Sequence, residues 1–536
     1  MPHPFQSAAR LSPTSFFSSA SAPNTMLAGT AKIEITCREV GAAAYVASPR
    51  TMEHIPKELW DKKVEIDDPL FLKALVIDDG CRKYAFITMD VTAIGCRTIT
   101  QDILGDSADD FMPRLRGCLL ECHGITADCV TVCASHTHPP GRLLCSDVEQ
   151  IQKGVSAVTQ AIENLVPVKV GAGSAQQDRL TFNRTLMMKD GTDYTIRGCN
   201  PHPADEDVEA LRPIDPEVGV LRIDRLDGTP LAVVYNFASH LLVGTPYSKI
   251  TADFPGVTSD YLEKTLGHGA MAFFTQGAGG DISEIAQLDR DHPRWGHEFG
   301  VILGESVLEA FGKASPAEGN LKIVSETISF PLRTDIPEVV ASLRREQAGL
   351  MASLRYTNLN FKTFLPLYLK YSLNPDFPLH SAYRYLHAEQ SGNVGYGALA
   401  NRNKLAIAKY LSSLKAMEKM ARNEEKIATL LRQQEVIDEL GTKEICAEIQ
   451  GIKIGECVFI TAPMEVLAET GLKLKKSSPF ENTFLASISN GYLHYAPPSA
   501  YYPRGGYEAT ECLLAPEWQF LFEESIGRIF VRLQNA

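Results

Sequence analysis

The sequence predicts an α/β protein in which mixed β-sheets are flanked by helices. Three observations predict it. Short apolar runs recur and pass into polar residues or glycine, helix-like segments lie between several of them, and the chain is 44% hydrophobic and 22% charged, which is typical of soluble globular proteins. Apolar runs that alternate with helical segments form sheets covered by helices. At 536 residues, the chain is long enough for one elaborated enzyme domain.

Residues 1–26 are expected to be a disordered leader that stays outside the fold. Its first 25 residues carry one Arg and no acid, and they are rich in Ser, Ala and Pro, which also suits a transit-like segment. Met26 could equally be the true start. We expect residues 27–536 to form a single domain, and the absence of a clear secretory signal predicts a cytoplasmic protein.

The first elements of the domain are two β-like runs, LFLKALVIDDG and KYAFITMDV, which predict a hairpin because an Asp- and Gly-rich turn joins them. Five later apolar runs are further strand candidates: CVTVCASHTH, LAVVYNFASH, AMAFFTQGAGGD, ECVFITAPME and TFLASISNGYLHY. Helix-like segments at 145–164, 256–266 and 296–312 lie between several of them. No internal repeat is found.

Residues 332–440 are predicted to be a helical insertion. Apolar residues recur there at three- and four-residue steps, as in amphipathic helices, and Gly441 is expected to end the last helix. The apolar stripes include Leu405, Leu411, Leu414, Met417, Ile427 and Leu431. We expect them to face a core, with binding of a partner as the alternative. The aromatic segment 361–387 is expected either to pack on the sheet or to cover an apolar substrate channel.

Charge and cysteine usage exclude several classes of function. The chain has 52 basic and 65 acidic residues and a net charge of −13, which argues against nucleic acid or an anionic membrane as the main partner. No apolar run approaches the roughly 20 residues of a membrane-spanning helix. The twelve cysteines form no CxxC pair, so neither a zinc knuckle nor a disulfide framework is indicated. Oligomeric state is not predicted.

Polar residues at the ends of the apolar runs are the candidate functional groups. His136 and His138 are two residues apart, and side chains at that spacing on a strand share a face. Further candidates end the other runs: His240, Asp281, Ser283, Glu465, Tyr492 and Tyr495. Ligands bind outside the carboxyl ends of strands in open α/β sheets, so these residues are expected to meet in one cleft. Two imidazoles and a carboxylate form a familiar site for catalytic zinc.

Structural roles compete with each of these assignments. Glu465 precedes a helix-like segment and could interact with the helix dipole. Tyr495 and Tyr507 could be packing aromatics. Arg184 could form a surface ion pair, and Asp281 could cap its own glycine loop.

Five motifs together resemble the catalytic domain of the neutral/alkaline, non-lysosomal ceramidase family. ASHTHPPG, NFASHLLVG, TQGAGGDIS, TAPMEVLAETG and NGYLHYAPPSAYYPRGGYEAT occur in the family's order, after the N-terminal signatures AGTAKIEIT and FITMDVTAIG. The similarity runs from about residue 27 to 525, except for the helical insertion. It implies that Zn²⁺ is bound by His136, His240, Glu465 and Tyr495. It also implies active-site residues around the metal: His138, Arg184, Ser283 and Tyr507.

Two departures from the family put ceramide itself in question. Only 29 residues follow Tyr507, so the family's C-terminal immunoglobulin-like domain is expected to be absent. Glu284 follows Ser283 where the family usually has proline, which changes the shape or charge of the pocket. The chain looks more like shorter relatives that share only the ceramidase N-terminal domain.

The resemblance implies a zinc-dependent amidohydrolase that cleaves N-acylsphingosine or a related N-acyl amine with metal-activated water. The partner would be a small-molecule or lipid amide, with no nucleic acid and no transmembrane segment involved. His138 would shuttle a proton, the Tyr507 hydroxyl would stabilise developing negative charge, Arg184 would orient a polar head group, and Ser283 would contact the scissile group. Two alternatives stay open: a zinc hydrolase of a non-lipid amide, ester or lactone, and a non-catalytic binding protein with the same fold.

Overall fold

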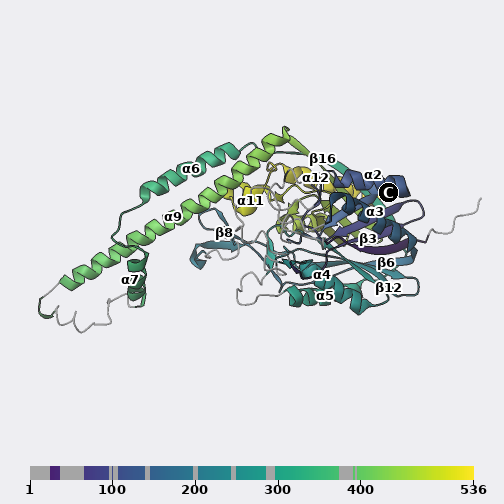
Figure 1. The fold of residues 1–536 in the computed structure, drawn as a ribbon, viewed down its shortest axis with the longest axis horizontal. Helices are drawn as coiled ribbons and strands as arrows, with labels where there is room; N and C mark the ends of the chain where they lie inside the picture. The colour runs from purple at the N-terminus through teal and green to yellow at the C-terminus, as the bar shows by residue number, and fades with distance from the viewer. Residues whose placement is uncertain are drawn as a thin grey trace, which may run out of the picture.

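The computed structural model describes residues 25–36, 65–95, 99, 107–138, 145–196, 203–242, 249–284, 296–373, 390–392 and 395–535. Its body is built around two large β-sheets with helices around them, and a long helical arm projects from this body (Figure 1). Residues 1–24 of the expected leader lie outside the described residues. Met26 is buried in the core, and its carbonyl accepts a hydrogen bond from the Val168 amide at 3.0 Å.

The larger sheet has eight strands in the order β14-β12-β11-β6-β1-β3-β4-β5. Their bounds are β1 (Leu27–Glu34), β3 (Phe71–Asp78), β4 (Lys83–Met89), β5 (Val130–Ala134), β6 (Val166–Gln176), β11 (Glu217–Arg225), β12 (Pro230–Phe237) and β14 (Met271–Gln276). The predicted hairpin is confirmed, because β3 and β4 pair antiparallel. The pairs β4·β5 and β12·β14 are parallel, so the carboxyl ends of β5 and β12 are free to carry functional residues.

The smaller sheet has four strands in the order β16-β17-β18-β20. They are β16 (Leu321–Pro331), β17 (Glu444–Ile454), β18 (Cys457–Ala462) and β20 (Asn482–Ser487), with β18 and β20 parallel. The two sheets share one hydrophobic core. They approach closely where Gly219 of β11 faces Phe484 of β20, since a Cβ on Gly219 would lie 2.3 Å from that ring.

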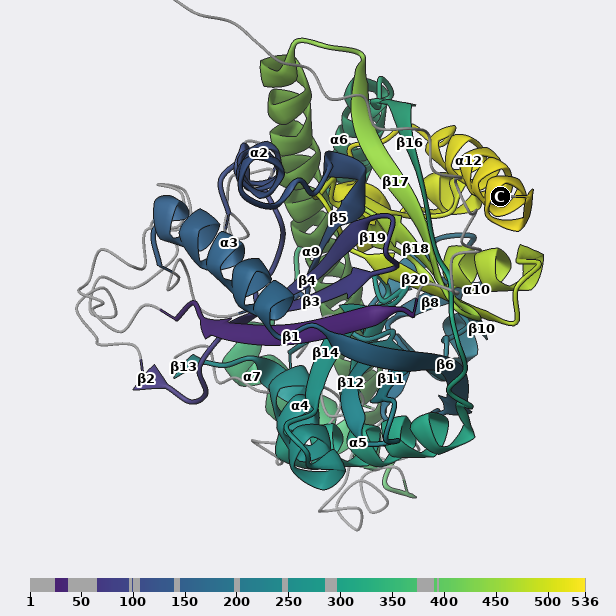
Figure 2. The same cartoon turned by 90° about the vertical axis from the view of Figure 1, so that its right-hand side faces the viewer.

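Helices cover the outer faces of both sheets (Figure 2). α3 (Asp147–Glu163) covers β1 and β3, and α2 (Phe111–His123) packs beside α3, whereas α4 (Asp253–Leu266) and α5 (Gly296–Lys313) cover β6, β11 and β14. α10 (Ala468–Ser477) packs beside β20, and α12 (Trp518–Asn535) packs on β16 and β17. The three helix-like segments predicted between strands are therefore helices. The predicted fold class, mixed sheets flanked by helices, is confirmed.

Short elements connect these layers and carry several candidate site residues. They are β2 (Glu65–Ile66), β7 (Thr181–Asn183), β8 (Thr185–Met188), β9 (Asp193–Thr195), β10 (Val208–Leu211), β13 (Lys249–Ile250), β15 (Ile282–Glu284), β19 (Glu465–Val466), β21 (Tyr495–Ala496), α11 (Tyr507–Glu511) and the 3₁₀ segments η3 (Ala127–Cys129), η4 (Asp205–Asp207) and η6 (Ser499–Arg504).

The arm consists of α6 (Ile336–Ser353), α7 (Phe361–Leu373) and the long α9 (Gly395–Leu440) (Figure 1). α9 ends where Gly441 takes a left-handed conformation, with φ 60°, as expected for a helix C-terminus. The expectation that its apolar stripes face a core is only partly right, because Ile427 is buried but Leu405 is 63% exposed. The expectation that α7 packs on the sheet is wrong. α7 packs on α9 instead, and the rings of Phe364 and Tyr410 are 4.4 Å apart.

Within the described part of the chain, no helix combines the length and apolarity needed to cross a membrane. All nine described cysteines are free thiols, and five of them are buried.

Candidate metal centre

His136 reaches the centre from a backbone that has already left the strand. β5 ends at Ala134, and His136 has a left-handed φ of 70°. His136 and His138 face one space, as expected, with ring centroids 4.6 Å apart, but this left-handed turn brings them together and strand alternation does not. The Val91 carbonyl accepts a hydrogen bond from the His136 amide, and the Thr92 carbonyl lies 2.8 Å from Nδ1. These two contacts hold the ring in place.

His240 follows β12 and is held by the glycine loop after β14. Its amide donates to the Ile282 carbonyl at 3.0 Å, and its Nδ1 lies 2.8 Å from the Gly279 carbonyl. A carbonyl can only accept a hydrogen bond, so Nδ1 must carry the proton in both His136 and His240. The Nε2 atom of a neutral ring then presents a lone pair, as in metal-binding histidines.

Glu465 lies between the two histidines. Its Oε2 is 3.3 Å from Nε2 of His136 and 3.2 Å from Nε2 of His240. The other carboxylate oxygen, Oε1, accepts a hydrogen bond from the Tyr492 hydroxyl. Glu465 belongs to β19 and not to the following helix α10, so it does not act as a helix-terminal carboxylate. That place is taken by Asp281, whose Oδ1 accepts from the Ala468 amide at 2.9 Å.

Tyr495 faces the same centre from β21, directly opposite Glu465 in the parallel β19·β21 pair. Its hydroxyl lies 3.3 Å from Nε2 of His240 and accepts a hydrogen bond from Nη2 of Arg184 at 3.1 Å. The alternative of a surface ion pair for Arg184 is wrong, because Arg184 is buried and pairs with buried Glu508 at 2.8 Å.

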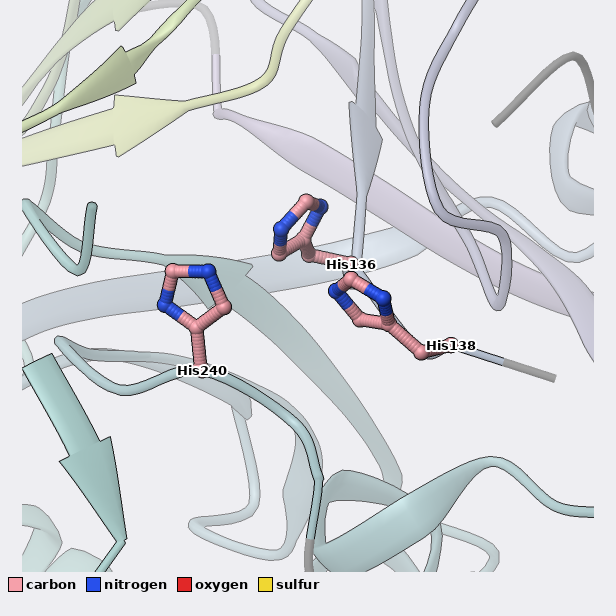
Figure 3. Close-up of side chains that lie close together, drawn as sticks. All are labelled: His136, His138 and His240. Atoms are coloured by element: carbon pink, nitrogen blue, oxygen red, sulfur yellow. The ribbon is translucent and has the colours of Figure 1, made fainter. Parts of the chain in front are cut away.

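The donor set fits a metal ion. His136, His138 and His240 each offer a nitrogen within 4.8 Å of the others (Figure 3). Zinc bonds to nitrogen and oxygen are about 2.0–2.1 Å long, which places neighbouring ligands of a tetrahedral ion about 3.3 Å apart. The separations of Glu465 Oε2 from the two imidazoles match this spacing.

Hydrogen bonding supports the same conclusion. Nε2 of His136 and Oε2 of Glu465 are buried, yet neither makes a hydrogen bond. Two acceptors facing each other in a buried site are unfavourable unless a cation or a well-aligned proton lies between them. Burial lowers the pKa of His136, but Glu465 outweighs it and raises the pKa, so a proton and a metal cation compete for the position between these two atoms.

Burial and charge set the protonation of the centre. Burial lowers the pKa of His138 well below its usual value, and the neighbouring His136 and His240 lower it further. Burial also lowers the pKa of His240. For Glu465, burial is outweighed by His136 and His240, so its pKa lies well below the usual range. The centre therefore combines an ionised carboxylate with neutral His138 and His240, the states that bind a metal.

His138 and Tyr507 also lie at the centre, and Ser283 directly follows Ile282, whose carbonyl accepts from the His240 amide. Nε2 of His138 is a buried atom without a hydrogen-bond partner. Ser283 lies on β15, fully buried, and its hydroxyl has no hydrogen-bond partner either. Tyr507 begins α11, and its ring is 5.5 Å from that of Tyr495. Glu284 is also buried, and burial raises the pKa of its carboxyl well above the usual value.

Three contributors to the centre were not assigned from the sequence. Tyr492 was noted only as a polar residue at a run's end, yet it orients Glu465. Glu508 balances the charge of Arg184. It directly follows Tyr507 in the motif GGYEAT, and this position beside a predicted site residue could have identified it. The Thr92 group that contacts His136 is a backbone carbonyl, which every residue has, so the residue type could not predict this contact.

The comparisons with known proteins found similar solved structures but no similar sequences. No profile of a known protein family matches the sequence, and no curated protein matches it. Neutral ceramidase from Pseudomonas aeruginosa aligns with a TM-score of 0.59 and 16% identity, over 95% of this chain and 74% of that one. A ceramidase complexed with C2 aligns with a TM-score of 0.59 and 15% identity, over 95% and 75% of the two chains. The chain thus has a neutral-ceramidase-like fold, as its motifs predict, and the fold carries a histidine cluster that could hold a metal ion.

Proposed function

We propose that this chain is a zinc-dependent hydrolase that cleaves an amide bond in N-acylsphingosine or a related N-acyl amine. The observation that carries the proposal is the approach of Glu465 Oε2 to the Nε2 atoms of His136 and His240, at 3.3 and 3.2 Å, inside a ceramidase-like fold. The ceramidase neighbours support the choice of an acyl amide as substrate.

His136, His240, Glu465 and Tyr495 would hold the ion, and His138 is the further nitrogen within reach. When bound, zinc would supply a Lewis acid and lower the pKa of coordinated water to about 7. Tyr492 orients Glu465, while Arg184 holds the Tyr495 hydroxyl at 3.1 Å and pairs with Glu508. Such outer partners typically account for 10- to 100-fold in metal affinity.

The remaining residues act on the proton and on the developing charge. His138 is neutral, so it can accept a proton from the attacking water as the water oxygen bonds to the amide carbon. His138 then donates that proton to the nitrogen as the carbon–nitrogen bond breaks, giving a carboxylic acid and an amine. The Tyr507 hydroxyl would donate a hydrogen bond to the amide oxygen, and loss of one such donor typically costs about 100- to 1000-fold in rate. Ser283 would contact the scissile group.

The test combines metal analysis with a hydrolysis screen. The full chain should contain zinc and hydrolyse at least one N-acyl amine. His136→Ala should lose both zinc and hydrolysis, whereas His297→Ala, a change at an exposed histidine of α5, should retain both. Hydrolysis only of non-lipid amides, esters or lactones would redirect the substrate assignment. Bound zinc without turnover of any substrate would favour a binding protein, and an active His136→Ala variant would contradict the proposed centre.

A further inference from the structure

The outer end of the arm exposes an unusual amount of apolar surface. We define the arm tip as residues 354–373 and 395–417, which comprise α7, the segment before it and the outer half of α9. Large apolar side chains on the arm tip are strongly exposed, among them Tyr356 (87%), Phe361 (66%), Leu369 (50%), Leu373 (85%) and Leu405 (63%). Scattered exposed apolar residues are normal, but a group of them on one small element marks an interaction site.

The arm tip is also basic in an acidic protein. It contains seven Lys and Arg residues and no Asp or Glu, and Lys362, Arg402 and Lys409 are among those exposed. Acidic residues return in α9 at Glu418, immediately after the tip. The arm tip is therefore positively charged although the whole chain has a net charge of −13. The overall negative charge does not argue against binding of an anionic membrane by the arm tip.

The exposed apolar face of α7 is not the face by which this helix packs on the protein. A different face of α7 is already packed. Phe364 and Tyr371 are buried against Ile407 and Ala400 of α9. Asn403 donates a hydrogen bond to the Tyr371 hydroxyl at 3.1 Å. α7 is thus held firmly on α9 by one face, and it presents a second apolar face outward.

The arm tip lies far from the metal centre. Figure 1 shows α7 at the end of the arm away from the sheets. The inner part of α9 contacts α11, where Gln433 donates a hydrogen bond to Glu511 at 3.0 Å. At 1.5 Å per residue, Leu405 lies about 42 Å along the helix from that contact. The exposed apolar face consequently cannot line the reaction site.

We propose that the arm tip binds the surface of an anionic lipid membrane. Aromatic and leucine side chains would enter the boundary between headgroups and acyl chains, and the surrounding Lys and Arg residues would contact acidic headgroups. The absence of acidic side chains among the tip's described residues favours a negatively charged lipid surface over an uncharged one. The inference goes beyond the proposed reaction and does not depend on it, because binding is measured without turnover.

The test is flotation of the full chain with vesicles. We expect it to float with vesicles of equimolar phosphatidylcholine and phosphatidylserine, and to float far less with phosphatidylcholine alone or at high salt. The double variant Lys362→Gln/Lys409→Gln should bind about 25-fold more weakly, at about fivefold for each charge lost near the surface. The variant Leu369→Ser/Leu373→Ser should also lose most of its binding.

Matched controls use exposed residues of the body. Lys264→Gln, whose side chain is 80% exposed, and Leu211→Ser, which is 75% exposed, should float like the parent chain. Equal circular dichroism spectra and equal melting temperatures would show that the tip variants are folded. Failure of the parent chain to float, or unchanged flotation of both tip variants, would overturn the proposal. So would a parent dimer that becomes monomeric in the tip variants without any vesicle binding, because the tip would then be a self-association surface.

Discussion

Glu465 and Tyr495 lie directly opposite each other in the parallel β19·β21 pair, and both reach Nε2 of His240, at 3.2 and 3.3 Å. Two short strands that follow β18 and β20 of the smaller sheet therefore supply two donors. His240 follows β12 of the larger sheet. The centre lies where the carboxyl ends of strands from both sheets meet, so the proposed metal site would require correct packing of the two sheets.

Replacing Glu465 by glutamine should nearly abolish metal binding. The amide keeps the size of the side chain but removes the negative charge between His136 and His240. We expect zinc affinity to fall more than 100-fold, beyond the 10- to 100-fold that loss of an outer partner typically costs. Competition with a chelating dye measures the affinity. Glu481→Gln, at an exposed position, should bind zinc normally, and normal zinc affinity in Glu465→Gln would remove Glu465 from the ligand set.

Replacing Tyr492 by phenylalanine should weaken the centre without destroying it. The change removes the hydroxyl that donates to Glu465 Oε1 and leaves the buried ring in place. Zinc affinity should fall 10- to 100-fold. Tyr84→Phe is the matched control, since it removes another buried tyrosine hydroxyl, which donates to Thr131 at 2.8 Å. Equal zinc affinity in the two variants would show that Tyr492 does not orient the carboxylate.

Much of this centre could be predicted from the sequence, because apolar runs that end in polar residues place those residues at strand ends. His240 and Glu465 were found in this way. The orientation of His136 was not, since it depends on a left-handed backbone with φ 70° and not on strand alternation. Glu508 was missed as a site residue because its role depends on Arg184, 324 residues away along the chain.

The arm shows a different limit of sequence analysis. Three- and four-residue periodicity predicts that α9 is a helix, but periodicity does not say what the apolar stripe contacts. Ile427 packs against the body, whereas Leu405, on the same helix, is 63% exposed. The difference arises because α9 extends beyond the sheets, and that geometry depends on tertiary packing and not on local sequence.

Packing between the two sheets gives a test of the fold that is independent of the metal. A Cβ on Gly219 would lie 2.3 Å from the Phe484 ring, whereas a Cβ on Gly117 of α2 would meet nothing within 4 Å. Gly219→Ala should therefore lower the free energy of unfolding by about 1–3 kcal/mol. Gly117→Ala should raise it by about 0.5–1 kcal/mol, because alanine favours a helix. Urea denaturation measures both free energies of unfolding. Equal effects of the two changes would contradict the close contact between Gly219 of β11 and Phe484 of β20.

Ionisation of the Asp90 carboxyl should lower the free energy of unfolding as the pH rises. Burial is the main cause that raises the pKa of its carboxyl from 3.8 to about 6. Well below pH 3.8 the carboxyl is neutral in both states. Between about pH 4 and pH 6 the unfolded chain releases the proton first, so the free energy of unfolding falls; above pH 6 the loss is complete. A shift of this size corresponds to at most about 3 kcal/mol.

Asp90→Asn removes this titration and keeps an oxygen that can accept the Phe71 amide, which Asp90 Oδ2 accepts at 2.8 Å. The difference in unfolding free energy between Asp90→Asn and the parent chain should therefore grow by about 2–3 kcal/mol from pH 4 to pH 7. Taking this difference cancels the titration of groups that do not interact with Asp90. A flat difference for Asp90→Asn would show that the Asp90 carboxyl is hydrated and that burial does not hold its proton up to pH 6.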